Sequence, residues 1–63
     1  MAFPEKLKSL RLKHKLTQTG LGEKLYVSRS TISNYEKGKF EPNTQTLIEM
    51  SKLFNIPIDE LLK

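Results

Sequence analysis

The chain has 63 residues, with 11 lysines and arginines against 7 aspartates and glutamates, and it contains no cysteine. A domain of this length buries only about 60% of the surface that its unfolded chain exposes, so a deep enzyme-like cleft does not fit in it. Without cysteine, neither a disulfide nor a thiolate zinc site can hold the fold together. Helix packing therefore has to supply the stability.

The positive charge lies in the first two thirds of the chain. Residues 1–40 carry nine Lys/Arg and three Asp/Glu, a net +6, whereas residues 41–63 carry two and four, a net −2. This asymmetry is typical of a protein with one face that meets a polyanion. A solubilising surface explains the charge equally well. The start of the chain lacks the apolar core of a signal peptide, and no run of about 18 apolar residues predicts a membrane span. We therefore expect a cytoplasmic protein with no membrane contact.

Apolar residues recur at helical spacing along most of the chain, and no stretch alternates as a strand does. A first helix is predicted over about residues 4–14, with Pro4 in its first turn. Thr17 is a good N-cap for a second helix. The residues expected to face the core from these two helices are Phe3, Leu7, Leu10, Leu21 and Leu25.

A short break at Tyr26 and Val27 separates the second helix from a third. Ser28 caps this third helix, which is predicted to run to about Lys37 with Ile32 and Tyr35 facing inward. Gly38 ends it, because glycine readily adopts the left-handed conformation found at helix ends.

A loop through Pro42 leads to a fourth helix capped by Asn43 or Thr44. Asn55 is predicted to cap the C-terminal end of this helix, and Pro57 opens a last short helix. The residues expected to face inward from the fourth helix are Leu47, Ile48, Ser51 and Phe54. The sequence therefore predicts one compact all-α domain of five helices over residues 1–63, without a repeat or linker.

The most informative segment is residues 17–39, in which two short helices meet across a turn of three to four residues. This is the geometry of a helix-turn-helix, and Gly22 is small where the two helices approach most closely. The outer face of the third helix is polar, and its side chains can bond to base edges or phosphates. These residues are Arg29, Ser30, Ser33, Asn34 and Lys37.

Four short segments stand in the order and spacing of a known family: Leu16-Thr17-Gln18, Val27-Ser28-Arg29, Thr31-Ile32-Ser33 and Tyr35-Glu36-Lys37-Gly38. With them, and with Leu10-Arg11 before them, the chain resembles the Cro/repressor (XRE-like) helix-turn-helix family over nearly its whole length. The resemblance implies a lambda-repressor-like DNA-binding domain whose third helix, the recognition helix, enters the major groove of double-stranded DNA.

The resemblance also implies roles for individual residues. Gln18, at the start of the second helix, matches a position that grips a DNA phosphate and braces the recognition helix; the alternative is an ordinary polar residue in a first turn. Arg29 matches a base-reading position and is suited to guanine O6 and N7, unless it touches a phosphate or solvent instead. Ser30 and Asn34 match further contact positions, and Ser33 faces the same way.

Ser28, Lys37 and Lys39 are expected to position the domain on DNA, the two lysines through phosphates, without reading sequence. Arg11 and Glu36 match a pair that forms an ion pair in this family, between the first helix and the end of the third. We therefore interpret these two residues as structural, although Arg11 lies in a basic run.

The sequence departs from the family at four positions. Gly20 and Gly22 lie inside the second helix, where each costs about 1 kcal/mol relative to alanine, and only Gly22 has an evident packing reason. Tyr26 stands where the family usually has a turn glycine, so either Tyr26 adopts a positive φ or the turn differs locally. Lys15 likewise replaces a common glycine.

The leading functional hypothesis is a sequence-specific repressor that binds a pseudo-palindromic operator as a homodimer, with recognition helices about 34 Å apart. Candidate dimer contacts, which alternatively close the monomer core, are Ile58, Leu61 and Leu62. A different hypothesis is an antitoxin that holds a toxin as well as DNA, or a fragment of a larger regulator. An enzyme is disfavoured because no nucleophile–base pair or phosphate loop is present, and His14 alone makes no metal site, so no cofactor is expected.

Overall fold

The computed structural model describes residues 3–63. Its helices are α1 (Phe3–Lys13), α2 (Gln18–Leu25), α3 (Arg29–Lys37), α4 (Thr44–Phe54) and α5 (Ile58–Leu61). No strand occurs among residues 3–63, so the predicted all-α fold of five helices is confirmed. The first helix starts and ends one residue earlier than the sequence predicts.

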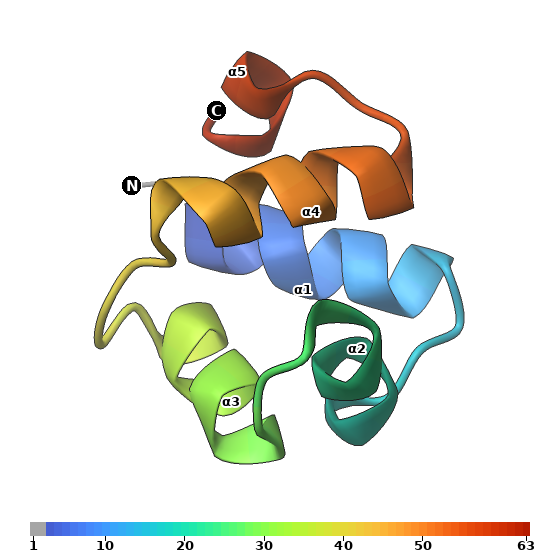
Figure 1. Ribbon diagram of the computed structural model, residues 1–63, viewed down its shortest axis with the longest axis vertical. Helices are drawn as coiled ribbons and strands as arrows, with labels where there is room; N and C mark the ends of the chain where they lie inside the picture. The colour runs from blue at the N-terminus through green and yellow to red at the C-terminus, as the bar shows by residue number, and fades with distance from the viewer. Residues whose placement is uncertain (1–2) are drawn as a thin grey trace.

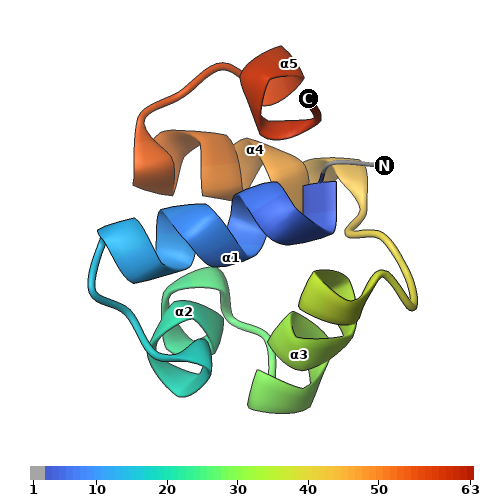
Figure 2. The same cartoon turned by 180° about the vertical axis from the view of Figure 1, so that it is seen from behind.

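Helix α1 crosses the middle of the molecule, with α4 and α5 on one side and α2 and α3 on the other (Figures 1 and 2). Helix α3 packs against both α1 and α2, and α5 packs against α4 and α1. Both α2 and α3 begin at the edge of the molecule farthest from α5 (Figure 1). The first residues of these two helices therefore share one side of the protein.

The helix ends follow the local signals in the sequence. A side-chain oxygen accepts a hydrogen bond from the backbone amide three residues further on at Thr17, Ser28 and Asn43. Gly38 and Asn55 end α3 and α4 in the left-handed conformation, with φ of 75° and 57°. Pro57 precedes α5 as its cap residue rather than lying inside the helix.

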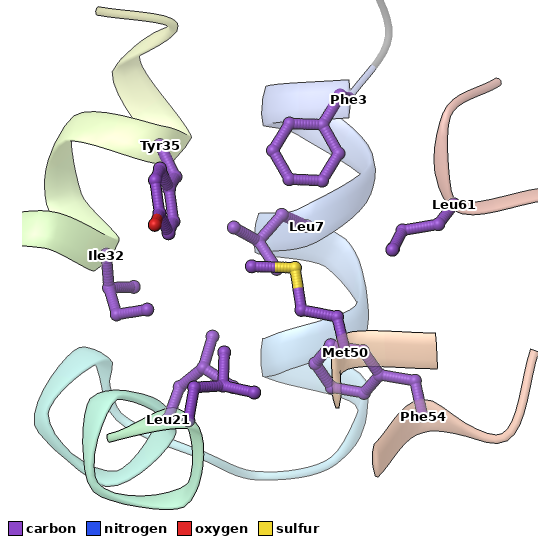
Figure 3. Packing of buried hydrophobic residues seen from close by; sticks show 9 residues of the cluster. Phe3, Leu7, Leu21, Ile32, Tyr35, Met50, Phe54 and Leu61 are labelled. Atoms are coloured by element: carbon purple, nitrogen blue, oxygen red, sulfur yellow. The ribbon is translucent and has the colours of Figure 1, made fainter. Parts of the chain in front are cut away.

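The core gathers side chains from all five helices around Leu7 (Figure 3). Its buried apolar members are Phe3, Leu7, Leu21, Leu25, Ile32, Tyr35, Met50, Phe54 and Leu61. Met50 is fully buried although the predicted inward face of α4 omitted it. It lies one helical turn before Phe54, so both side chains face the core, whereas Ile48 and Ser51 lie at the margins of this face and are half-buried.

The three candidate dimer contacts at the last helix, α5, differ in how far they are buried. Leu61 is completely buried and closes the core beside α1 and α4. Leu62 is exposed and Ile58 is half-buried. Leu61 therefore stabilises the monomer, and only the other two have surface to offer a partner.

The turn between α2 and α3 is left-handed at a tyrosine. Tyr26 has φ 61° and ψ 39°, so the first of the two alternatives for this turn is correct. The side chain is 91% exposed, so few packing contacts offset the backbone strain. Lys15, in the loop between α1 and α2, has a similar φ of 60°.

Replacing Tyr26 by glycine is expected to raise the free energy of unfolding by about 0.5–1 kcal/mol. An L-residue in the left-handed region costs about 1–2 kcal/mol, and the greater freedom of glycine in the unfolded chain offsets part of this gain. Thermal unfolding followed by circular dichroism measures the effect as a rise of a few degrees in Tm. The control is Glu23→Gly, at an exposed position inside α2, which should lower Tm. A lower Tm for Tyr26→Gly would show that the tyrosine ring itself stabilises the fold.

The two glycines of α2 differ in their surroundings. A Cβ atom on Gly22 would lie 2.6 Å from the carbonyl oxygen of Val27, so the helix passes too close to the following turn for any side chain. A Cβ atom on Gly20 would lie 3.2 Å from the hydroxyl of Thr17, the oxygen that caps α2. The space around Gly20 is therefore tight, but a side chain rather than backbone limits it.

Gly22→Ala is expected to destabilise the protein by about 1–2 kcal/mol, because the clash with backbone exceeds the gain of about 1 kcal/mol in helix propensity. Urea unfolding gives the difference in free energy. Gly20→Ala is the matched control within the same helix, and it should leave the protein more stable than Gly22→Ala does, because the nearest atom belongs to a side chain that can shift. Equal losses for the two variants would mean that the turn can move away from α2.

Candidate nucleic-acid interface

The start of α3 presents a set of polar side chains to solvent. Ser28 accepts a hydrogen bond from the amide of Thr31 at 3.1 Å and also pairs with the Thr31 hydroxyl at 2.9 Å. Arg29 and Ser30 follow in the first turn and are exposed, as is Ser28. Ile32, one helical turn after Ser28, is completely buried. This burial holds the first turn of α3 against the core while its polar side faces outward.

Further along α3, the polar side chains differ in exposure. Ser33 and Asn34 are half-buried, and Tyr35 is buried in the core. Lys37 and Lys39 are exposed at the other end of the helix and beyond it. Lys37 lies eight residues after Arg29, or about 12 Å along the helix axis. The two lysines therefore do not belong to the cluster at the start of α3.

Gln18, the first residue of α2, lies between two side chains of α3. Its amide Nε2 donates to Glu36 Oε1 at 3.2 Å, and its Oε1 accepts from Arg29 Nη1 at 3.2 Å. The sequence resemblance indicated a brace on the recognition helix but neither of these partners. Because they lie 18 and 11 residues away, no local pattern signals either contact.

Arg11 and Glu36 form an ion pair beneath this cluster. Arg11 Nε donates to Glu36 Oε2 at 2.7 Å, and Nη2 donates to Oε1 at 3.2 Å. The two side chains are only 9% and 5% exposed. Arg11 Nη1 also donates to the carbonyl of Leu16 at 2.9 Å, in the loop that leads to α2. The pair therefore joins α1 to the last turn of α3 and to the start of α2.

Residues 3–63 contain no group of three side chains suited to hold a metal ion. Within the same range, no helix combines the length and the apolar character that a membrane span requires. His14 packs against the ring of Phe54, with centroids 5.0 Å apart.

Known proteins resemble this chain in sequence and in fold. A transcriptional activator of Enterococcus faecalis, BcrR, is 53% identical over 62 residues, which is 98% of this chain and 30% of that protein. An HTH-type regulator of Methanocaldococcus jannaschii, MJ0272, is 43% identical over 89% of this chain and 85% of its own length. The crystal structure of the P22 c2 repressor in complex with a synthetic operator superposes with a TM-score of 0.91 at 36% identity, covering 97% of this chain and 92% of that one.

The chain spans between 30% and 53% of the length of several curated relatives that it matches. The helix-turn-helix family model matches residues 7–61, which include all of α2, α3, α4 and α5. On this match, and on the similarity to the lambda-type fold of the P22 repressor, the chain belongs to the helix-turn-helix family of Cro/repressor (XRE-type) transcriptional regulators.

Proposed function

We propose that this domain binds double-stranded DNA sequence-specifically, with the start of α3 in the major groove. The observation that supports this most directly is the common position of the starts of α2 and α3, which are joined there by the Gln18–Arg29 hydrogen bond. Two helix starts on one side direct unpaired backbone amides and positive dipole ends toward the same surface, where phosphates are favoured. The role proposed is binding rather than catalysis.

The polar residues divide into two groups in this proposal. Those nearest the start and outer face of α3 read bases: Arg29, Ser30, Asn34 and Ser33. Of these, Arg29 is suited to guanine and Asn34 to adenine. Those that hold the domain on the phosphate backbone are Gln18, Ser28, Lys37 and Lys39.

We further propose that the domain is the DNA-binding part of a transcriptional regulator, most simply a repressor on a pseudo-palindromic operator. The high similarity to the operator-bound P22 repressor supports this proposal, and the greater length of several relatives supports a larger regulator. Because the similar protein BcrR is an activator, a measurement has to distinguish repression from activation. A reporter placed downstream of the selected site gives it, and a rise in expression would overturn the repressor assignment.

Selection of binding sites from random duplexes with the purified protein tests DNA binding. We expect enrichment of one short motif, and in a homodimer two inverted copies about 10 base pairs apart between centres. The variant Arg29→Ala, carried through the same selection, is the control for contamination by other binding proteins. Failure to enrich any motif at low salt would overturn sequence-specific binding.

Homodimer formation is tested by analytical ultracentrifugation at micromolar concentration, with and without the selected duplex. A dimer on DNA that is weakened by Leu62→Glu would support an interface at α5, because Leu62 is exposed there. A strict monomer under both conditions would remove the dimer from the proposal.

A further inference from the structure

Four polar side chains form one continuous hydrogen-bonded network, which runs from the interior to the surface. It begins at the buried Arg11 of α1, passes through Glu36 of α3 and Gln18 of α2, and ends at the exposed Arg29 of α3. Within α3, Arg29 is the first residue and Glu36 lies seven residues further on, about two helical turns away. The network links Glu36 to Arg29 only through Gln18.

We propose that Glu36 is a positioning residue for base reading, because it sets the orientation of the Gln18 amide and thereby the position of Arg29. This inference depends on the proposed function above. It goes beyond the structural ion pair, since it gives Glu36 a role in sequence preference as well as in stability.

The donor and acceptor of each hydrogen bond determine how the Gln18 amide is oriented. An ionised carboxylate can only accept, so Glu36 requires the donor end of the Gln18 amide, Nε2, to face it. The amide is planar, so its carbonyl oxygen Oε1 then points away from Glu36. A guanidinium can only donate, and Arg29 Nη1 meets this oxygen at 3.2 Å. With a neutral amide at position 36, either orientation of Gln18 would be satisfied.

Burial makes this orientation persistent. The Glu36 side chain is 5% exposed and accepts two further hydrogen bonds from Arg11, at 2.7 and 3.2 Å, so water has little access to compete for it. Arg29, which is exposed, would otherwise sample many rotamers. Holding it against Gln18 before DNA arrives reduces the ordering that binding requires.

The network leaves the groups that DNA needs available. Arg29 uses one N–H of Nη1 for Gln18, so its other guanidinium N–H groups remain for guanine O6 and N7. Gln18 Nε2 carries two hydrogens, of which Glu36 takes one. The second can donate to a phosphate, so Gln18 is able to serve both the backbone contact and the positioning of Arg29.

The test compares wild type and Glu36→Gln on the selected site and on duplexes changed at the base pair that Arg29→Ala identifies. We expect the wild-type preference at that base pair to fall about 3- to 10-fold, the equivalent of one hydrogen bond, while preferences at other base pairs persist. Competition binding below the melting temperature of both proteins measures the ratio. Met50→Ala, a core change outside the network, is the control for lost stability: it should lower Tm but keep the preference.

Two further variants separate positioning from packing. Gln18→Met leaves the Arg11–Glu36 pair intact and removes the acceptor of Arg29. It should lose the same preference, while the loss of its own phosphate contact weakens binding to every duplex alike. The double variant Gln18→Glu with Glu36→Gln restores an acceptor for Arg29, since the new glutamine can donate to the new glutamate. Its preference at the Arg29 base pair should recover. Binding to every duplex should weaken, because the negative charge moves from the buried position 36 to position 18, which is assigned to a phosphate contact.

The outcomes distinguish this inference from the proposed function. If no motif is selected, sequence-specific binding itself fails. If a motif is selected and Glu36→Gln keeps the wild-type preference at the Arg29 base pair, the positioning role is wrong while the proposed function stands. Should Glu36→Gln not fold, Gln18→Met alone decides, and an unchanged preference in that variant overturns the proposal.

Discussion

Glu36→Ala is expected to lower the free energy of unfolding by about 3–5 kcal/mol. The variant removes one member of a buried ion pair, in which the Arg11 side chain is 9% exposed, and leaves this arginine without its carboxylate partner. A domain of this length has only a few kcal/mol of stability, so a substantial unfolded fraction is expected at 37 °C. Urea unfolding followed by circular dichroism at 10 °C gives the free energy of unfolding.

The matched control is an exposed ion pair in the same chain. Lys63 and Glu60 lie 3.4 Å apart, with side chains 68% and 49% exposed, so Glu60→Ala should change stability by less than about 1 kcal/mol. Replacing both buried partners, as Arg11→Met with Glu36→Leu, should recover much of the loss because no charge is then stranded. If Glu36→Ala proved as mild as Glu60→Ala, the buried pair would contribute little to the fold.

Arg29→Ala is expected to reduce affinity for the selected site by about 1–3 kcal/mol, or roughly 5- to 150-fold, and to relax preference at one base pair. A bidentate contact to guanine discriminates against the other bases, so its loss affects the cognate duplex more than random DNA. The side chain is exposed, and its removal should leave Tm nearly unchanged. Binding isotherms on the selected site, its single-base variants and a random duplex measure the effect.

Lys37→Ala is the comparison for Arg29→Ala, because Lys37 is exposed at the opposite end of α3 and is assigned to phosphates. It should weaken binding to all duplexes alike and reduce the salt dependence by about one unit of slope. Uniform loss for Arg29→Ala as well would mean that Arg29 touches the phosphate backbone and that Ser30 and Asn34 carry the reading.

Local signals were enough to predict the five helices and most of their ends. Helices are capped by side-chain bonds to backbone three residues away, at Thr17, Ser28 and Asn43. Gly38 adopts its positive φ without the strain that a side chain would cause. Such effects depend on neighbours in the sequence and on helical periodicity, so composition and spacing reveal them. The polar outer face of α3 was predictable for the same reason.

The pairing of side chains across the helices required the tertiary structure. Gln18 meets Arg29 and Glu36 only because α2 packs against α3, and no rule of spacing describes contacts 11 and 18 residues apart. The burial of Met50 and the separation of Leu61 from Leu62 likewise depend on which helix lies opposite.

The conformation of Tyr26 and the space around Gly22 also required the tertiary structure. A positive φ at Tyr26 was one of two possibilities in the sequence, and the path of the chain from α2 into α3 decided between them. Gly22 was expected to be tight, but the position of the Val27 carbonyl made a side chain impossible without movement. Periodicity and capping thus determined the elements, while packing determined which polar groups meet, because contact geometry depends on all helices at once.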